Sequence, residues 1–530
     1  MEAVGALGRR GLSPYLEAVR AWVSSRSRVF WLVAGLTAVA AALRFVTLGA
    51  QSYHHDEVIT ASRLLRGSFG HAMDAVGFSE SAPPLYYVLA WLWVQVAGNG
   101  EVGLRSFSAL AGVATVPVAY LIAAELRDRA AGIAAAALVA VNPMLLWYSQ
   151  EARAYALLVL LTSISFLYFA RALPGSARDA PVVRGPYGSL TTGTSRSLLL
   201  WGVFSGLALA THYFAFFPLA AEAVWLLRRR GRAAWRGVAV LVAFGLALAP
   251  LLAHQMSYAH AEWISNFSLG HRLWEAGMTF MVGETGDVIA QPEHPLFALA
   301  PALLAIAALL LIVSRGDGAD RRAAGVPLAI VATAVAAPLA IALVDPDKDF
   351  VLARNLMPAL VPLLVAIGVG CTLPAARRLG TLLGAALVAY SLGFSVWASV
   401  SPALQRPDWD AIAAELGEPA TPRAMVTWTI GAAPLRYYLS TGAYQPRPSE
   451  GFAWWVGEVD FVSRGETPPP PPSLLGPGFR QAAYAQVGRF RVRRYVWNSP
   501  GLGYLRLRVV SRAALGFRSN RVLLDGIGPE

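Results

Sequence analysis

Residues 104–126 have the sequence LRSFSALAGVATVPVAYLIAAEL, a mostly apolar run that ends just before Arg127. An α-helix rises about 1.5 Å per residue, so a run of this length can cross the ~30 Å hydrocarbon core of a bilayer. Similar runs recur along the 530 residues, which are 56% hydrophobic and only 14% charged. Soluble domains are about 25% charged. The sequence therefore predicts an integral membrane protein that crosses the bilayer many times.

The arginines give this predicted bundle a direction. Short arginine-rich loops follow 104–126 and lie again at 228–232, 315–322 and 377–378. The positive-inside rule assigns such loops to the cytoplasm. All of them fall on one side of the membrane if an all-α bundle crosses it about eleven times between residues 29 and 400.

This count treats the apolar run 85–97 as an interfacial helix and not as a span. The run is short for a crossing and is rich in tyrosine and tryptophan, which are typical of the membrane interface. Counting it as a span would invert every later segment and place the arginine clusters outside. We therefore predict one outside loop, 54–98, that holds two juxtamembrane helices.

The chain divides into three predicted segments. Residues 1–28 form a cytoplasmic tail, 29–400 the transmembrane domain, and 401–530 a small soluble α/β domain outside the membrane. A long polar loop is predicted at 254–294. The last segment mixes short helical and strand-like patterns, which are Asp408–Leu416, Ala432–Tyr438, Ala424–Trp428 and Arg489–Trp497.

Charge and cysteine content exclude several classes of protein. The formal net charge is +12, but most arginines lie in short loops between apolar runs. Their placement indicates membrane topology, so we expect no nucleic-acid partner. The single cysteine, Cys371, lies within an apolar run and cannot form an internal disulfide or a cysteine-based zinc site.

Four polar clusters are candidates for chemistry. The first is His54-His55-Asp56-Glu57, which follows the first predicted span. Charged side chains beside a membrane are costly, and an aspartate near arginines can act as a general base or a metal ligand. The alternative is an ordinary polar loop in which Asp56 caps the helix that follows.

The second and third clusters lie at later turns of the bundle. The segment YSQEARAY contains Tyr148, Glu151 and Arg153 at the predicted start of the fourth span. A charged pair in a bundle indicates a functional site, although it can also stabilise a helix start. The third cluster is His212 with Tyr213, between the fifth and sixth spans. A purely structural histidine is the alternative there.

The fourth cluster joins Asp345, Lys348 and Asp349 to Arg354 at the entry to the tenth span. The donor fork of an arginine matches phosphate oxygens, whereas the alternative is a side chain that snorkels to the interface. The predicted topology brings all four clusters to the outer face, although they are far apart in sequence. We expect one cavity there, with carboxylates for acid–base chemistry and arginines for an anion.

Several stretches occur in an order that is itself informative: ALRFVTLGAQSYHHDE, SAPPLYYVLAWLWVQVAG, EVGLRSFSALAGVATVPVAYLIA and NPMLLWYSQEARAYAL. Together they resemble the polytopic glycosyltransferases of the GT-C superfamily, in the branch related to protein O-mannosyltransferases and bacterial lipid A aminoarabinose transferases. Later, VLARNLMPALVP resembles the Arg-Tyr-x-x-x-Pro segment of that branch, with Asn355 in place of the tyrosine.

The resemblance implies transfer of a sugar, mannose or another hexose or pentose, from a polyprenyl-phosphate donor to a glycolipid, cell-wall polymer or protein. It implies that Asp56 deprotonates the acceptor hydroxyl and that Glu57 orients Asp56 or shares its proton. Glu151 matches a second acidic position, and Arg354 would hold the donor phosphate. Substrate contacts are expected from the neighbouring residues His54, His55, Tyr148, Arg153, His212 and Lys348. The enzyme would lie in the plasma membrane with its site on the extracytoplasmic face.

Some members of the superfamily need a divalent metal, which His54, His55 and Asp56 could ligate. We predict that none is required. Two other functions compete with glycosyl transfer. A transporter or lipid flippase would place its charges near the membrane midplane, often within inverted repeats, whereas these clusters lie at one face. A non-catalytic assembly protein, with an outer domain that binds cell-wall polymer, would work without Asp56.

Overall fold

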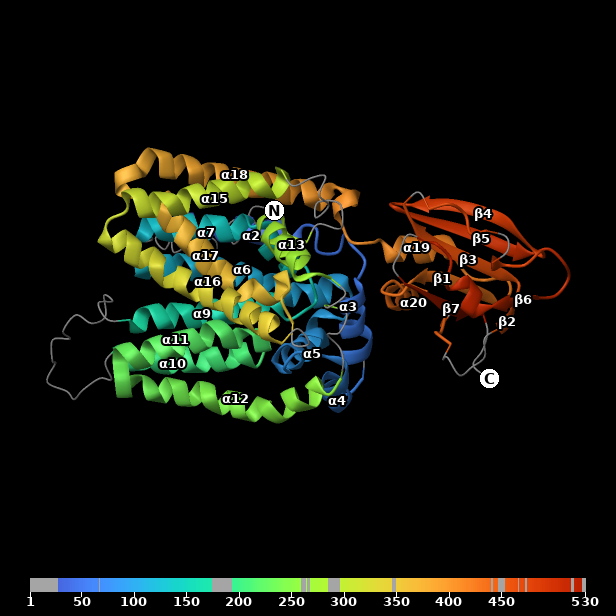
Figure 1. Cartoon of the computed structure of the whole chain (residues 1–530), viewed down its shortest axis with the longest axis horizontal. Coiled ribbons are helices and arrows are strands. Elements are labelled where there is room, and N and C mark those ends of the chain that lie inside the picture. Colours follow the sequence, from blue (N-terminus) through green and yellow to red (C-terminus); the bar gives the residue numbers. More distant parts are fainter. Residues whose placement is uncertain are drawn as a thin grey trace, which may run out of the picture.

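The computed structural model describes residues 27–65, 67–173, 193–258, 264, 267–284, 296–345, 349–439, 442–446, 453–465, 467–471, 474–515 and 519–526. A bundle of long helices occupies the first part of the chain, and a separate sheet domain follows α18 (Figure 1). The expected all-α membrane bundle and small α/β domain are therefore both present. Nearly all of the predicted cytoplasmic tail lies outside the described residues, as does Lys348.

The bundle is built from α2 (Arg28–Phe45), α6 (Glu101–Leu126), α7 (Arg129–Val141), α8 (Pro143–Ser149), α9 (Tyr155–Ala172), α10 (Gly193–Leu209), α11 (Phe216–Arg230), α12 (Trp235–Met256), α15 (Leu296–Arg315), α16 (Gly318–Val344), α17 (Leu360–Cys371) and α18 (Arg377–Val400). Within the described ranges, eight segments are long and apolar enough to cross a membrane, or nine if the bent pair α7 and α8 forms one span.

The count of eleven spans stays a prediction. It includes α10, whose 17 residues are near the lower limit for a crossing. It also divides the apolar segment Tyr213–Met256 at the turn η3 (Gly231–Ala234), where the chain reverses between α11 and α12 (Figure 1).

A bend of 56° separates α7 from α8 at Asn142 and Pro143. A helix end leaves carbonyl groups without partners inside the helix. The buried guanidinium of Arg44, on α2, satisfies them by donating to the Ala140 carbonyl at 3.0 Å, and it also donates to Ser149 Oγ at 3.1 Å. One arginine therefore joins α2, α7 and α8.

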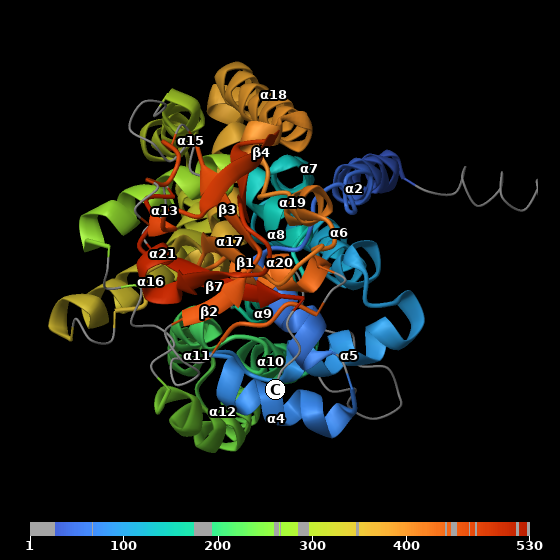
Figure 2. The same cartoon turned by 90° about the vertical axis from the view of Figure 1, so that its right-hand side faces the viewer.

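The first outside loop forms α3 (His55–Val58), η1 (Ile59–Leu64), α4 (Phe69–Ser79) and α5 (Leu85–Ala97). These elements lie at the end of the bundle that faces the sheet domain (Figure 1). From that side, α15 and α18 are seen end-on, whereas α4 and α5 run across the view (Figure 2). The apolar α5 has 13 residues and is shorter than a span. The two predicted juxtamembrane helices are thus α4 and α5.

One alternative interpretation and one local prediction are wrong. His54 is the residue that precedes α3, so Asp56 lies inside the first turn and does not cap the helix. The predicted polar loop 254–294 contains the helix α13 (Leu269–Val282), which begins where Ser268 Oγ accepts the His271 N–H at 3.3 Å. This helix is too short and too polar to appear in a search for apolar runs of about 20 residues.

The sheet domain contains α19 (Trp409–Leu416), α20 (Ala432–Tyr438), α21 (Leu507–Val510), β1 (Arg423–Trp428), β2 (Ala453–Val456), β3 (Glu458–Arg464), β4 (Phe479–Val487), β5 (Phe490–Trp497), β6 (Gly503–Arg506) and β7 (Asn520–Asp525). Five strands form a sheet in the order β4-β5-β3-β1-β7, with β1 and β3 parallel and the other pairs antiparallel. β2 and β6 form a second, two-stranded sheet. The four predicted patterns correspond to α19, α20, β1 and β5.

The sheet domain is docked on the first outside loop. The Ser52 hydroxyl donates to the Pro407 carbonyl at 3.0 Å and accepts the Trp409 N–H at 2.9 Å. The Tyr438 hydroxyl accepts the Tyr53 N–H at 2.6 Å. The residues just before the His54–Glu57 cluster are therefore held by the sheet domain.

Close packing of α6 on α8 depends on Gly112. A Cβ at this position would lie 2.0 Å from Ser149 Oγ and 2.9 Å from Arg44 Nε. We expect Gly112→Ala to destabilise the fold by about 1–3 kcal/mol, because a well-packed interior resists added atoms. Thermal unfolding of purified protein in detergent measures this. Gly35→Ala in α2, where no atom lies within 4 Å, is the control. Equal midpoints for the two variants would contradict the packing.

Candidate active site

Glu57 is the buried centre of the site. Its carboxylate accepts two hydrogen bonds from Arg105 of α6, each 2.7 Å long. The backbone N–H groups of His54 and Ala152 donate to it at 3.0 and 2.9 Å. Burial alone would raise the pKa of Glu57, but Arg105 and Arg406 hold it at about 2. Glu57 therefore ties the first outside loop to α6 and to the loop between α8 and α9.

The side chain of the neighbouring Asp56 is partly exposed to solvent. Its side chain is 28% exposed, and its Oδ2 lies 3.6 Å from Nη1 of Arg354, which is 27% exposed. Burial acts to raise the pKa of Asp56, yet Arg153 and Arg354 outweigh it and hold the pKa well below its usual value. Asp56 is therefore an ionised carboxylate that solvent can reach, beside a cation.

Glu151 lies in the loop between α8 and α9. Its Oε2 accepts a 2.8 Å hydrogen bond from Arg406, which also approaches Glu57 to 3.6 Å. Arg406 further donates to the Gln150 carbonyl at 3.0 Å and covers the Trp147 ring at 4.4 Å. Burial raises the pKa of Glu151 to about 7, although Arg406 opposes the shift. Glu151 is therefore a carboxyl group whose protonated form is favoured by burial and whose ionised form is favoured by Arg406.

Arg153 brings a further positive charge to Asp56. Its Nη2 donates to Glu80 at 2.9 Å and its Nη1 to Thr60 Oγ1 at 3.3 Å. Tyr87 donates to the same Glu80 carboxylate at 2.6 Å. These partners hold the guanidinium in place, so its charge acts on Asp56 from a fixed position.

Aromatic side chains form another wall of the site. Tyr148 donates to Glu284, and its ring lies 4.8 Å from that of Tyr155. The His212 ring lies 5.6 Å from the Tyr155 ring, and its Nδ1 accepts the Phe214 N–H at 3.3 Å. Burial is the main cause that lowers the pKa of His212 to about 3. The imidazole is therefore neutral and carries its proton on Nε2.

Arg354 lies in η6 (Ala353–Ala359), at the start of an apolar segment. Contacts of neighbouring residues hold the loop that leads into η6. The buried Arg272 of α13 pairs with Asp349 through two hydrogen bonds, one of them 2.8 Å long. Asn355, at the position where the related segment has tyrosine, donates its amide to the Phe350 carbonyl at 2.7 Å. Asn355 therefore supports the loop that presents Arg354.

Most of the residues predicted to form the site lie at this end of the bundle. Asp56, Glu57, Glu151, Arg153 and Arg354 contact one another or share partners, with Tyr148 and His212 beside them. The two histidines of the first cluster differ from each other in their surroundings.

The His55 ring bonds through Nδ1 to the Ile430 carbonyl of the sheet domain at 2.9 Å, so it faces the docked domain. His54 supplies its backbone N–H to Glu57, and burial lowers the pKa of its ring to about 4. In the described part of the chain, no group of three histidine, cysteine, aspartate or glutamate side chains is arranged to hold a metal ion.

Five charged residues of the site were not predicted: Glu80, Arg105, Arg272, Glu284 and Arg406. Arg105 had a signal in the sequence, because a charge within an apolar run usually faces the bundle interior. The other four resemble ordinary loop or surface residues until the tertiary contacts are known.

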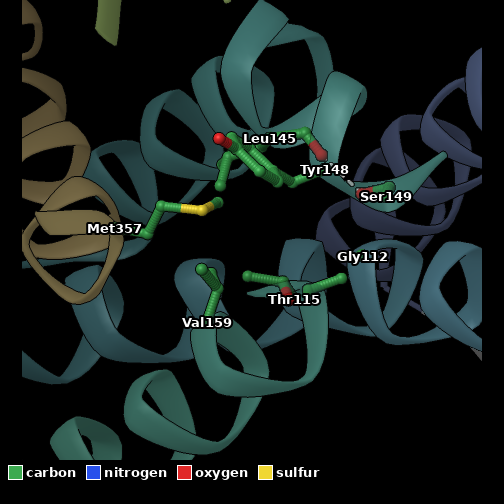
Figure 3. A pocket seen from close by; sticks show the side chains of 8 residues that line it. Gly112, Thr115, Leu145, Tyr148, Ser149, Val159 and Met357 are labelled. Carbon is green, nitrogen blue, oxygen red and sulfur yellow. Dashed lines mark hydrogen bonds between the residues drawn. The ribbon is translucent and has the colours of Figure 1, made fainter. Parts of the chain in front are cut away.

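A small enclosed cavity lies between Tyr148 and Met357 (Figure 3). It is lined by Gly112, Thr115, Leu145, Tyr148, Ser149, Ala156, Val159 and Met357. Its volume of about 10 Å³ is near the lower limit for a single water molecule. The cavity is too small for a sugar.

The structure thus combines a bundle of helices long and apolar enough to span a membrane with a cluster of carboxylates and arginines at one end. Residues 81–180 match a family described as dolichyl-phosphate-mannose-protein mannosyltransferase. The structure resembles that of ArnT from Cupriavidus metallidurans in the apo state, with a TM-score of 0.53 and 14% identity over 88% of this chain and 98% of that chain.

ArnT bound to undecaprenyl phosphate gives a TM-score of 0.52 and 15% identity over 89% of this chain and 99% of that chain. No curated protein matches the sequence. Residues 81–180 are therefore similar to a family of mannosyltransferases, and the chain shares the fold of ArnT.

The Glu57–Arg105 pair predicts a clear stability pattern. Arg105→Met leaves a buried carboxylate without its main partner and should destabilise the protein by about 3–5 kcal/mol. The double variant Arg105→Met/Glu57→Leu removes both charges and should recover most of that loss. Denaturant unfolding of both variants measures the difference. If the double variant were as unstable as the single one, the pair would not be the source of the effect.

Proposed function

We propose that this protein transfers a sugar from a polyprenyl-phosphate donor to an acceptor hydroxyl, with Asp56 as the general base. The observation that carries the proposal is the open Asp56–Arg354 pair. Glu57, Glu80 and Glu151 are 0%, 4% and 8% exposed, and each is held by an arginine. Asp56 is thus the carboxylate of this cluster that a substrate can best reach.

Arg354 would bind the donor phosphate. A guanidinium fork matches phosphate oxygens and forms charge-assisted hydrogen bonds with them. Because Arg354 stands at the first turn of the apolar segment Ala353–Cys371, a phosphate there leaves the attached lipid chain at the level of the bilayer. The binding of undecaprenyl phosphate by ArnT supports this class of donor.

The reaction follows from these two groups. The acceptor oxygen forms a bond to the anomeric carbon of the sugar while Asp56 takes the hydroxyl proton. The bond between the anomeric carbon and the phosphate oxygen breaks, and its electron pair stays on the polyprenyl phosphate. Arg354 stabilises the charge that develops on this leaving group. The proton on Asp56 then passes to solvent.

Donor binding would also strengthen the base. In the free protein, Arg153 and Arg354 lower the pKa of Asp56, which makes it a weak proton acceptor. A bound phosphate brings negative charge and takes up Arg354, and both effects raise the pKa of Asp56. Glu57, at the centre of the buried ion pairs, would orient Asp56 rather than share its proton.

The topology supports an extracytoplasmic site in the plasma membrane. The turn η3 and the connection between α15 and α16 lie at the end of the bundle away from the sheet domain (Figure 1). Both turns are rich in arginine, as the positive-inside rule requires of cytoplasmic loops. The site and the sheet domain would then lie on the opposite side.

Mannose is the first sugar to test, because the matching family is named for mannosyl transfer. Other hexoses and pentoses complete the donor panel, and glycolipids, cell-wall polymers and proteins the acceptor panel. Release of polyprenyl phosphate by the purified protein identifies the donor. If the protein consumes no donor with any acceptor, the proposed function is wrong.

Asp56→Asn is expected to lower the transfer rate by roughly 10²–10⁴-fold, because the amide keeps the size of the side chain but cannot accept the proton. Donor binding should remain close to wild type. Asp74→Asn, in the exposed part of α4, is the matched control and should retain full activity. Wild-type rates for Asp56→Asn would exclude it as the base.

Arg354→Met should weaken donor binding about 10- to 100-fold, the range expected for the loss of hydrogen bonds to a charged group. Arg354→Lys should lose less, because it keeps the charge. Removing the cation also raises the pKa of Asp56, so the acidic limb of the pH–rate profile should move to higher pH. Titration with a polyprenyl phosphate measures binding directly, and unchanged affinity for Arg354→Met would contradict the phosphate assignment.

A further inference from the structure

Arg406 belongs to the linker between α18 and α19, yet its guanidinium ends between two acids of the site. It is 5% exposed, 2.8 Å from Glu151 and 3.6 Å from Glu57. Its backbone N–H donates to Gln51 Oε1 at 3.1 Å. A linker residue therefore supplies a buried charge to a site that is otherwise built by the bundle and its loops.

The linker is held on both sides of Arg406, on one side by the sheet domain and on the other by Ser52. Before it, Arg489 donates to the Gln405 carbonyl at 3.3 Å. After it, the Pro407 carbonyl and the Trp409 N–H both bond to the Ser52 hydroxyl. These contacts join the start of the sheet domain to the first outside loop, so the position of Arg406 depends on them.

Tyr438 and Ile430 of the sheet domain also bond to residues of the bundle and of the loop after α2. The Tyr438 hydroxyl accepts the Tyr53 N–H and donates to Glu101 of α6, both at 2.6 Å. His55 bonds to the Ile430 carbonyl at 2.9 Å. The bonds that the Tyr438 hydroxyl forms reach neither Glu57 nor Glu151, so Tyr438→Phe tests docking without removing a hydrogen bond to either acid.

The charges around Glu151 explain why Arg406 is needed. Burial raises the pKa of Glu151 most, and Arg406 is the cation that lowers it. Glu57 and Asp56 of α3 and Glu284 after α13 raise it further. The phenols of Tyr148 and Tyr155 also face this group. Without Arg406, burial and three like charges would favour the protonated form of Glu151.

We propose that Arg406 is a positioning residue for Glu57 and Glu151, and that docking of the sheet domain places it in the site. The domain then acts as part of the catalytic unit and not as a separate appendage. This inference rests on the proposed glycosyl transfer for its activity readout. Its other readouts do not depend on activity.

The first experiment compares Arg406→Met and Arg406→Lys with the wild-type full-length protein. Infrared spectra over a pH series follow the carbonyl band of protonated carboxyl groups. In Arg406→Met the pH at which this band disappears should rise by about 1–3 pH units, because an adjacent opposite charge is lost. The acidic limb of the pH–rate profile should move in the same direction, and Arg406→Lys should restore most of both properties. Arg480→Met, at an exposed position of β4, is the matched control and should change neither.

The second experiment tests docking with Tyr438→Phe. The loss of its hydroxyl should loosen the domain, so limited proteolysis should cleave the linker near residues 401–407 faster than in the wild type. The pH–rate profile should shift in the same direction as for Arg406→Met. A purely structural role would lower the amount of folded protein and leave the profile where it is.

The outcomes separate the two proposals. If the wild type transfers no sugar, the proposed function fails, whereas the infrared and proteolysis results still decide the role of Arg406. If the wild type is active and Arg406→Met keeps its infrared titration and pH–rate profile, the role of Arg406 is wrong while the function stands. Unchanged behaviour of Tyr438→Phe in both assays would show that docking does not place Arg406.

Discussion

The buried pair of Glu57 and Arg105 is the interaction on which the site depends. A carboxylate removed from water is stable only when charges and hydrogen bonds surround it, and Glu57 has both. Because its partners come from α6, the loop before α9 and the linker to the sheet domain, one side chain brings those segments to a common point. Asp56 and Glu151 lie beside that point and take their positions from it.

Three acids with similar intrinsic chemistry have different environments. Glu57 is enclosed by arginines and stays ionised. Glu151 is buried among like charges with one cation, and its pKa rises to about 7. Asp56 is ionised and open to solvent beside Arg354. The burial and the neighbouring charges of each acid therefore assign its role, which the residue type alone does not.

Structural features that depend on a few consecutive residues could be predicted from the sequence. Apolar run lengths indicate the bundle and the short helix α5, and the short patterns at Asp408–Leu416 and Ala432–Tyr438 correspond to α19 and α20. The direction that the arginines give to the bundle stays a prediction. Hydropathy was less informative for helices whose length or apolar content is close to the limit for a span. The length of α10 leaves its crossing of the membrane a prediction, and α13 is too polar to be found in a search for apolar runs. The alternative in which Asp56 caps the helix was wrong because α3 begins two residues earlier, with His54 as its N-cap.

The sequence by itself determined the membrane class of this protein, its superfamily resemblance and the polar clusters of the site, because hydropathy, charge bias and short motifs are properties of contiguous residues. Only the tertiary structure decided which acid is exposed to solvent and which arginine pairs with each acid. Arg406 lies 255 residues after Glu151, and Arg105 lies 48 after Glu57. No local pattern records such pairings, since they arise when the bundle, the first outside loop and the docked sheet domain meet.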